Sequence, residues 1–224
     1  MGEIARKFEK LRKEVPESIR IVLAVKKRSP EEVLEVIEAG AADLGENYVQ
    51  EAETMIQALG KNAKRVNWHM IGGVQTNKIN KMIGLFDCIQ TVSSIEKAEA
   101  FHKRLERENK IMPVLIEVNI GEESSKQGIM PEYEEIEKLA VKITQMKYLK
   151  LEGVMTMGPV SENPEDHRYS FRKTREFFDR LKTLKLENSD IRWLSMGMSD
   201  SYKIALEEGA TMIRPGSLLF GKRQ

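Results

Sequence analysis

Cysteine is almost absent from this sequence, and its scarcity excludes two kinds of stabilised domain. The single thiol, Cys88, has no partner for a disulfide and cannot by itself build a structural zinc site. Because it stands in the largely apolar run Phe86–Ile89, we expect it to be reduced and buried.

Long apolar runs and an excess of one charge are also missing. No apolar stretch is long enough to span a bilayer, and residues 1–7 lack the hydrophobic segment of a signal peptide. Lys plus Arg (36) and Asp plus Glu (35) leave a formal net charge of +1, so no overall field attracts nucleic acid or an anionic membrane. We therefore expect a soluble, cytoplasmic protein that binds neither.

The chain does contain one pattern that repeats to its end. A short apolar or β-branched run is followed by a polar loop and then by a stretch with helical spacing. The expected strands are Ile21–Val25, Ala42–Gly45, Val66–Ile71, Cys88–Val92, Val114–Asn119, Leu151–Met155, Ile191–Met196 and Thr211–Arg214. Strict alternation indicates an α/β fold with a parallel sheet, and eight repeats favour a single (β/α)8 TIM barrel domain over residues 1–224. A doubly wound open sheet is the alternative, but no Gly-rich dinucleotide loop supports it.

The expected helices are Pro30–Ala39, Tyr48–Leu59, Ser94–Glu108, Met130–Gln145, Pro164–Leu184 and Ser199–Glu208. Two of them carry start signals. The first has Ser29 as an N-cap, followed by Pro30 and two acidic residues, and the second has Ser199-Asp200 as a cap. Only ten residues follow Arg214, too few for a full eighth helix. We expect the amphipathic segment Glu3–Glu14 to take that place in the outer ring.

The residues that follow the strands are the candidates for chemistry, because barrels of this kind form their sites at the C-terminal strand ends. Lys26 and Lys27 follow the first strand, and side-chain alternation allows only one of them to face the lumen. In an apolar barrel mouth, a lysine amine loses its proton more readily and can attack an aldehyde. The residues alone leave both lysines open.

The last two strands end in loops suited to an anion. Ser195–Asp200 and Pro215–Ser217 contain glycines and open helices, at the recurrent phosphate position of this barrel class. Arg214 ends the eighth strand, where its guanidinium would donate to a pyridine nitrogen and keep that nitrogen unprotonated. A phosphate site, a lysine and this arginine together are what a phosphorylated aldehyde cofactor requires.

Seven stretches carry a family resemblance: Leu23–Lys27, Gly45–Ala52, Trp68–Gly72, Gln75–Lys78, Ser124–Gly128, Leu194–Asp200 and Gly209–Ser217. Through them the sequence resembles the pyridoxal phosphate homeostasis proteins, relatives of the N-terminal barrel of alanine racemase and members of the fold type III PLP proteins. The resemblance implies that pyridoxal 5'-phosphate (PLP) is held as a Schiff base on Lys27. It also implies these further cofactor-binding residues: Ser199, Gly216 and Ser217 at the phosphate, Arg214 at the pyridine nitrogen, and Asn47 and His69 near the ring.

Three positions depart from the family pattern. Lys26 stands where the family usually has a small hydroxyl residue, which keeps open which lysine reacts. Ser29 stands where a second basic residue is common. Pro215 replaces a small or aliphatic residue and removes one backbone donor, which leaves the phosphate to Gly216 and Ser217. For His69, the alternative to a cofactor contact is a packed strand histidine that donates to a backbone acceptor.

The resemblance implies a monomeric carrier that acts in intracellular PLP and vitamin B6 homeostasis without substantial catalysis and passes the cofactor to PLP-dependent apoenzymes. A PLP-dependent amino-acid racemase is the alternative, and it needs an acid/base group on each face of the cofactor. Alanine racemases take one of these groups, a tyrosine, from a separate β domain and a partner subunit. A Schiff-base aldolase without cofactor would use a lysine but does not explain Arg214. We expect the carrier, with no metal.

Overall fold

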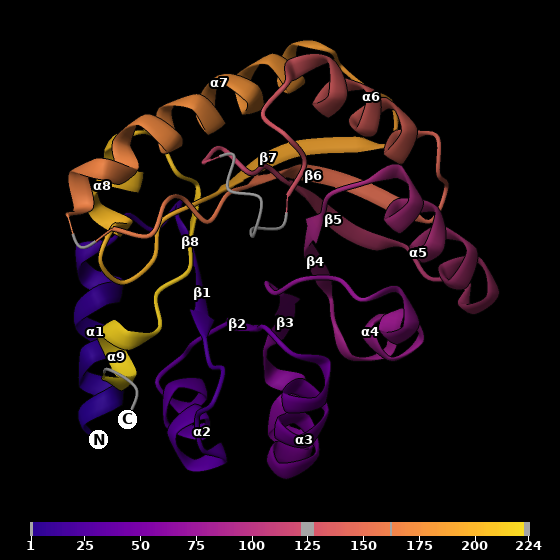
Figure 1. Cartoon of the computed structure of the whole chain (residues 1–224). Coiled ribbons are helices and arrows are strands. Elements are labelled where there is room, and N and C mark those ends of the chain that lie inside the picture. The colour runs from indigo at the N-terminus through magenta and orange to yellow at the C-terminus, as the bar shows by residue number, and fades with distance from the viewer. Residues whose placement is uncertain (1, 122–127, 162, 222–224) are drawn as a thin grey trace.

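Eight parallel strands close into a barrel in chain order, with β1 paired to β8 (Figure 1). The structure is a computed structural model that describes residues 2–121, 128–161 and 163–221. The strands are β1 (Arg20–Ala24), β2 (Asp43–Glu46), β3 (Asn67–Met70), β4 (Cys88–Val92), β5 (Met112–Glu117), β6 (Leu149–Met155), β7 (Ser189–Ser195) and β8 (Met212–Ile213). Every strand bound lies within two residues of the sequence prediction, and the barrel, not the open sheet, is confirmed.

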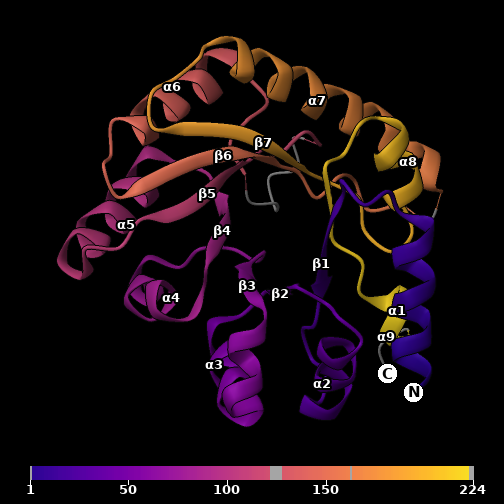
Figure 2. The same ribbon diagram turned by 180° about the vertical axis from the view of Figure 1, so that it is seen from behind.

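The helices lie outside the ring of strands, as both ribbon views show (Figures 1 and 2). They are α1 (Glu3–Glu14), α2 (Pro30–Glu38), α3 (Val49–Leu59), α4 (Ile79–Leu85), α5 (Ile95–Glu108), α6 (Tyr133–Thr144), α7 (Arg168–Thr183), α8 (Tyr202–Glu207) and α9 (Ser217–Phe220), with short 3-10 turns η1 (Gly60–Arg65), η2 (Thr76–Lys78) and η3 (Pro164–His167). The expectation for Glu3–Glu14 is confirmed: α1 packs against α2 and α9 and completes the outer ring. Helix α4 is not among the helices expected from the sequence.

The two helix starts read from the sequence have different outcomes. Ser29 forms a capping box with Glu32, and Pro30 occupies the first turn, as expected. The expectation for Ser199-Asp200 is wrong, because α8 begins only at Tyr202. The Ser199 hydroxyl instead accepts hydrogen bonds from Gly216 N and Leu218 N, so a contact with the last loop replaces the local cap.

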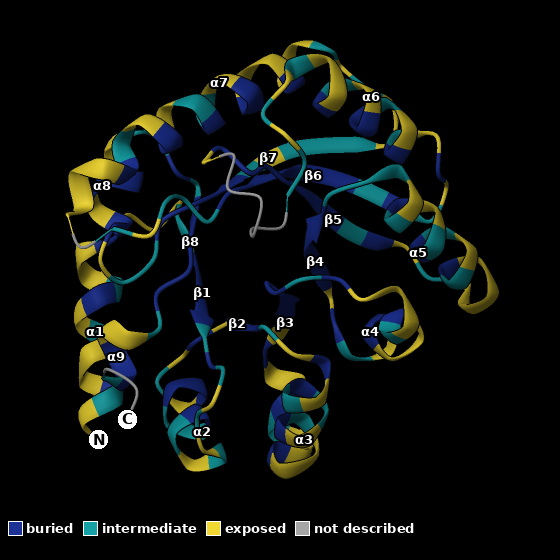
Figure 3. Ribbon diagram, in the orientation of Figure 1, coloured by how far each residue is buried: buried dark blue, intermediate teal, exposed yellow. Residues whose placement is uncertain are grey.

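The core has two layers, one between strands and helices and one in the barrel lumen. Figure 3 shows the first layer as buried helix faces turned toward the strands, with exposed faces outside. On β1, Leu23 and the following Val25 pack in this outer layer. Val22 points the other way, and a Cβ on Gly45 would lie 3.1 Å from it and 2.8 Å from Ile71. The side chains of β1 therefore alternate between helix layer and lumen.

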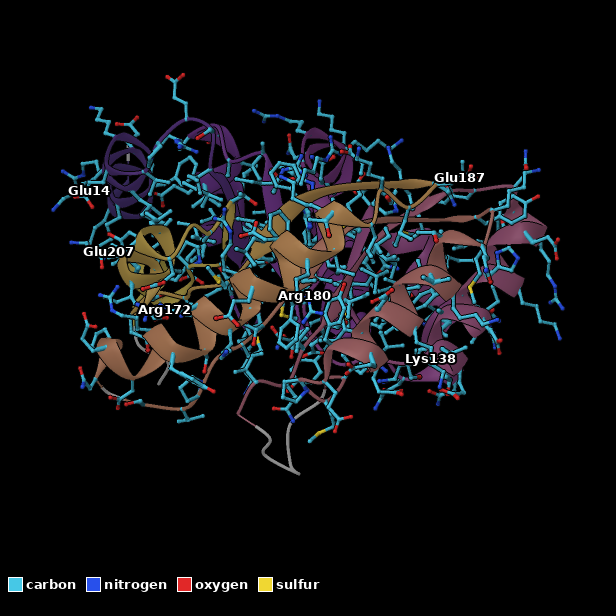
Figure 4. All side chains as sticks on the ribbon, turned by 90° about the horizontal axis from the view of Figure 1, so that it is seen from above. Glu14, Lys138, Arg172, Arg180, Glu187 and Glu207 are labelled. Atoms are coloured by element: carbon cyan, nitrogen blue, oxygen red, sulfur yellow. The ribbon has the colours of Figure 1, made fainter. Side chains whose placement is uncertain are left out.

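Charged side chains cover the outer surface of the helices. Arg172 and Glu207, which Figure 4 labels, come from the neighbouring helices α7 and α8. Arg172 pairs with Glu208, and Arg168 reaches both Glu207 and Glu208 at 2.7 and 2.9 Å. These ion pairs join the two helices at the surface, where each contributes little on its own.

The expected burial of Cys88 is confirmed, and burial raises the pKa of its thiol well above the usual value. Within the described part of the chain, no helix combines the length and the apolar character needed to cross a membrane.

Candidate functional site

A cavity of about 150 Å³ opens where several strands end, and we call it the mouth cavity. Its lining residues are Ala24, Lys26, Arg28, Asn47, Ile71, Met157, Met198, Ser199, Asp200, Arg214, Gly216 and Ser217. Five of the seven site residues expected from the sequence are among them; Lys27 and His69 are not. Its charged side chains are three cations and one acid, so the mouth cavity suits an anion.

The structure differs from the expectation for the lysine. Lys26 is partly buried and lines the mouth cavity, whereas Lys27 is exposed and lines a separate cavity with Glu46 and Glu51. Strand β1 ends at Ala24, and both lysines lie in the following turn, which a hydrogen bond from Arg28 N to Val25 O closes at 3.1 Å. At Lys27 the backbone turns into the left-handed region (φ 57°), and its N–H donates to Glu51 Oε2 at 3.0 Å.

The sequence contains a signal for the side of β1 that faces the helices. Ile21, Leu23 and Val25 form one side of the strand with three large apolar residues, as the side facing the helices requires. The other side carries Val22 and Ala24 and faces the lumen.

The loops after β7 and β8 meet at Ser199. Its hydroxyl accepts from Gly216 N at 2.9 Å and from Leu218 N at 3.0 Å, so backbone N–H groups and a hydroxyl gather at one place in the mouth cavity. Gly216 is required here because a Cβ would lie 2.9 Å from the Ala24 carbonyl oxygen. Converging N–H groups with a closely approaching backbone are what an oxyanion needs.

Arg28 ties the last helix to the end of β1. Its guanidinium donates to the carbonyl oxygens of Phe220 and Gly221 at 3.0 and 2.8 Å. Because those carbonyls end α9, Arg28 holds in place the helix that begins at the Ser199 contact, and Arg28 also lines the mouth cavity.

Arg214 is buried, with only 2% of its surface exposed, and a side chain and a backbone carbonyl hold its guanidinium in place. It donates to Ser195 Oγ at 2.7 Å and to the Thr156 carbonyl oxygen at 2.8 Å. Burial lowers the pKa of Arg214 to about 10, although the nearby Glu117 carboxylate opposes this shift. The guanidinium therefore remains charged at neutral pH, as the sequence analysis expects.

His69 lies in the lumen beneath Arg214 and reaches it through two other side chains. Ser195 Oγ donates to Gln90 Oε1 at 2.7 Å, and Gln90 Nε2 lies 3.1 Å from His69 Nδ1. His69 Nε2 lies 3.0 Å from Asp43 Oδ1, so the partners of His69 are side chains, not the backbone acceptor considered above. These buried side chains form one hydrogen-bonded row from Arg214 to Asp43, which we call the lumen row.

The charge state of Asp43 determines which groups donate and which accept in the lumen row. Burial opposes ionisation of Asp43, but the bonds from His69 and the contacts of Arg20 and Asn67 outweigh it and hold the pKa of Asp43 below its usual value. An ionised Asp43 accepts, so His69 carries its proton on Nε2 and accepts at Nδ1 from the Gln90 amide. Gln90 is the residue that the sequence analysis missed; its signal is a lone amide in the otherwise apolar start of β4.

Asn47 lies at the end of β2, against the loop after β3. Its carbonyl oxygen lies so close to Gly72 that a Cβ there would clash with it. Asn47 lines the mouth cavity, and its buried Oδ1 has no hydrogen-bond partner among the described residues. The preceding Glu46 is also buried; burial, helped by Glu51, raises its pKa to about 8, while the Asn47 N–H and Lys26 oppose the shift.

One stretch of the sequence pattern, residues 124–127, lies outside the described residues. Five of the other stretches contribute residues to the mouth cavity, and the sixth, Gln75–Lys78, lines a separate cavity that also contains Asn47.

The family model "Alanine racemase, N-terminal domain" matches residues 1–224. The fold and the site thus define a barrel of the alanine racemase class. A pyridoxal phosphate homeostasis protein from Aquifex aeolicus is 38% identical to the chain, over 92% of this chain and 87% of that protein. The one from Haemophilus influenzae is 37% identical, over 90% and 84%. The chain belongs to the family of pyridoxal phosphate homeostasis proteins.

A solved structure supports the same relationship in three dimensions. PipY from Synechococcus elongatus, solved with PLP bound, superposes with a TM-score of 0.88 at 27% identity and covers 97% of this chain and 100% of its own.

Proposed function

We propose that this protein binds PLP in the mouth cavity and acts in PLP homeostasis as a carrier, without substantial catalysis. The observation that carries the proposal is the gathering of Lys26, Arg214, Ser199, Gly216 and Ser217 around one positively charged cavity. The names of the relatives and the PLP bound to PipY support it.

Lys26, not Lys27, is the amine that we assign to the cofactor. PLP supplies an aldehyde that condenses with a primary amine. Lys26 shares its cavity with Ser199 and Gly216, whereas Lys27 is exposed and lines a separate cavity.

The remaining residues have separate tasks in this proposal. Ser199, Gly216 and Ser217 receive the phosphate, and the buried Oδ1 of Asn47 is an acceptor for a polar group on the ring. Arg214 donates to the pyridine nitrogen and, being charged itself, leaves that nitrogen without a proton. A ring without that proton is a weak electron sink, which fits a carrier better than a racemase. His69 acts on Arg214 through Gln90 and Ser195 and does not touch the ring.

We further propose a cytoplasmic, monomeric protein, one domain over residues 1–224, that passes PLP to apoenzymes. Light scattering after gel filtration tests the monomer. Mixing the yellow protein with a PLP-dependent apoenzyme tests transfer: recovery of that enzyme's activity is expected, and none would refute the carrier.

The lysine assignment is tested by absorbance and by chemical trapping. The purified protein, loaded with PLP, should be yellow, and borohydride followed by peptide mapping should place the cofactor on Lys26. Lys26→Ala should abolish the visible band. Lys27→Ala, the neighbouring lysine on the same loop, is the matched control and should keep it.

The opposite result for the two variants, or a label on Lys27, would overturn the assignment but leave PLP binding intact. A wild-type protein that is colourless after incubation with PLP and removal of the unbound cofactor would refute the binding proposal itself.

A further inference from the structure

A second cavity, of about 140 Å³, lies beside the mouth cavity at the ends of β5 and β6, and we call it the Glu117 cavity. Its lining residues are Glu117, Val118, Asn119, Ile120, Gly121, Thr156, Met157 and Gly158. Met157 lines both cavities, and the Thr156 carbonyl holds Arg214. The two cavities are therefore neighbours, and a molecule in one lies beside the contents of the other.

Glu117 is the charged group of this cavity. It is the last residue of β5, is 5% exposed, and alternates with Ile116 and Val118, which pack in the helix layer. Its Oε2 is buried and has no hydrogen-bond partner among the described residues. Leaving a buried carboxylate oxygen unpaired is costly, so a ligand that satisfies it gains the corresponding free energy.

The chemistry of the lining selects the kind of ligand. An ionised carboxylate only accepts hydrogen bonds, and a charged donor forms the stronger bond. Ile120 and Met157 give the cavity an apolar part, which suits a short carbon chain. These features together call for a small molecule with a positively charged nitrogen and an apolar body.

We propose that the Glu117 cavity binds a small primary amine, such as the ammonium group of an amino acid, next to the cofactor. This proposal rests on the proposed function, because it places the amine beside bound PLP. The carrier would then have a binding site for primary amines, the compounds that compete with its lysine for the aldehyde of PLP.

Glu117 is also placed to hold a proton taken from that amine. Burial raises its pKa to about 7, while Arg214 and Lys97 oppose the shift. The carboxylate accepts one proton from the ammonium group, which leaves a neutral amine with its lone pair and a neutral carboxyl group. Only a neutral amine is a nucleophile, so this transfer prepares the ligand.

The test uses PLP-loaded protein that has been reduced with borohydride, so that the cofactor stays on its lysine and no exchange occurs. The probe is the methyl group of Met157 in protein labelled with 13C-methyl methionine, assigned with Met157→Leu. Titrations with propylamine, 1-propanol and propionate compare a cation, a neutral molecule and an anion of similar size.

Propylamine should shift the Met157 signal saturably, and propanol and propionate should bind at least about tenfold more weakly. Glu117→Gln keeps the size of the side chain and should weaken propylamine about tenfold or more. Glu134→Gln, an exposed acid on α6, is the control and should change nothing. Equal binding of the three probes by the wild type would overturn the proposal whether or not Glu117→Gln folds, and so would unchanged affinity in a folded Glu117→Gln.

The outcome also separates this proposal from the proposed function. If borohydride attaches no cofactor, the proposed function fails, and the same titration of the unloaded protein then tests the cavity alone. If the adduct forms but the amine does not bind, only the amine site is refuted.

Discussion

Replacing Gln90 by leucine should destabilise the protein strongly, because Gln90 is the middle of the lumen row. The side chain is fully buried and contacts Ser195 Oγ at 2.7 Å and His69 Nδ1 at 3.1 Å. Leucine is similar in size, so the main loss is polar: the Ser195 hydroxyl loses its acceptor and His69 Nδ1 loses its donor. An unpaired buried group costs about 1–3 kcal/mol, so the two together cost about 2–6 kcal/mol.

That loss is a large part of the total stability of a typical domain, about 5–15 kcal/mol, and urea unfolding measures it directly. The midpoint should fall while the dependence on denaturant stays the same. Gln57→Leu, at an exposed position on α3, is the control and should change the free energy of unfolding by less than about 0.5 kcal/mol. A loss below about 1 kcal/mol for Gln90→Leu would show that the row does not carry the energy assigned to it.

Ser195 and Gln90 are neighbours in the lumen row, so substitutions of the two residues should have coupled effects on stability. Ser195→Ala leaves Gln90 Oε1 and one Arg214 N–H unpaired, and Gln90→Leu removes the acceptor that Ser195 uses. The double variant should therefore lose less stability than the sum of the single variants, by about 0.5–3 kcal/mol. Additive losses would mean that the two side chains act independently.

Three further predictions concern pH, the phosphate loop and activity. The raised pKa of Glu46, about 8 in the fold against 4.5 unfolded, means that folding favours its protonated form; stability should fall as pH rises from about 5 to about 8. In Glu46→Gln, the free energy of unfolding measured with urea should decrease less over this pH range. An unchanged decrease would contradict the raised pKa of Glu46. Gly216→Ala should weaken PLP binding about tenfold or more in spectroscopic titrations, because its Cβ would press on the Ala24 carbonyl, whereas Gly84→Ala, which meets nothing within 4 Å, should bind normally. Alanine racemisation, followed by chiral chromatography, should stay at background, and sustained turnover would favour the racemase alternative.

Much of the fold follows from the sequence because periodicity is a local property. Each strand needs only a run of apolar or β-branched residues, and each helix only a spacing near 3.6, so strand bounds agree within two residues. Helix α4 was not predicted because it follows a loop rich in glycine and polar residues, and its seven residues are too few to show a clear helical spacing. The cap at Ser29 is equally local, since serine and Glu32 satisfy each other across one turn.

Less of the site than of the fold follows from the sequence, because the contacts of the site join residues far apart in the chain. The sequence by itself determined the residue types, a lysine, an arginine and a glycine-containing loop at strand ends, and the rule that only one of two adjacent lysines faces the lumen. Only the tertiary structure placed Lys26, and not Lys27, at the mouth cavity, because both lysines lie in the turn after β1, where strand alternation no longer applies. It also decided that His69 contacts Gln90, because the pairing of side chains across the lumen depends on the closed barrel that brings β3, β4 and β7 together.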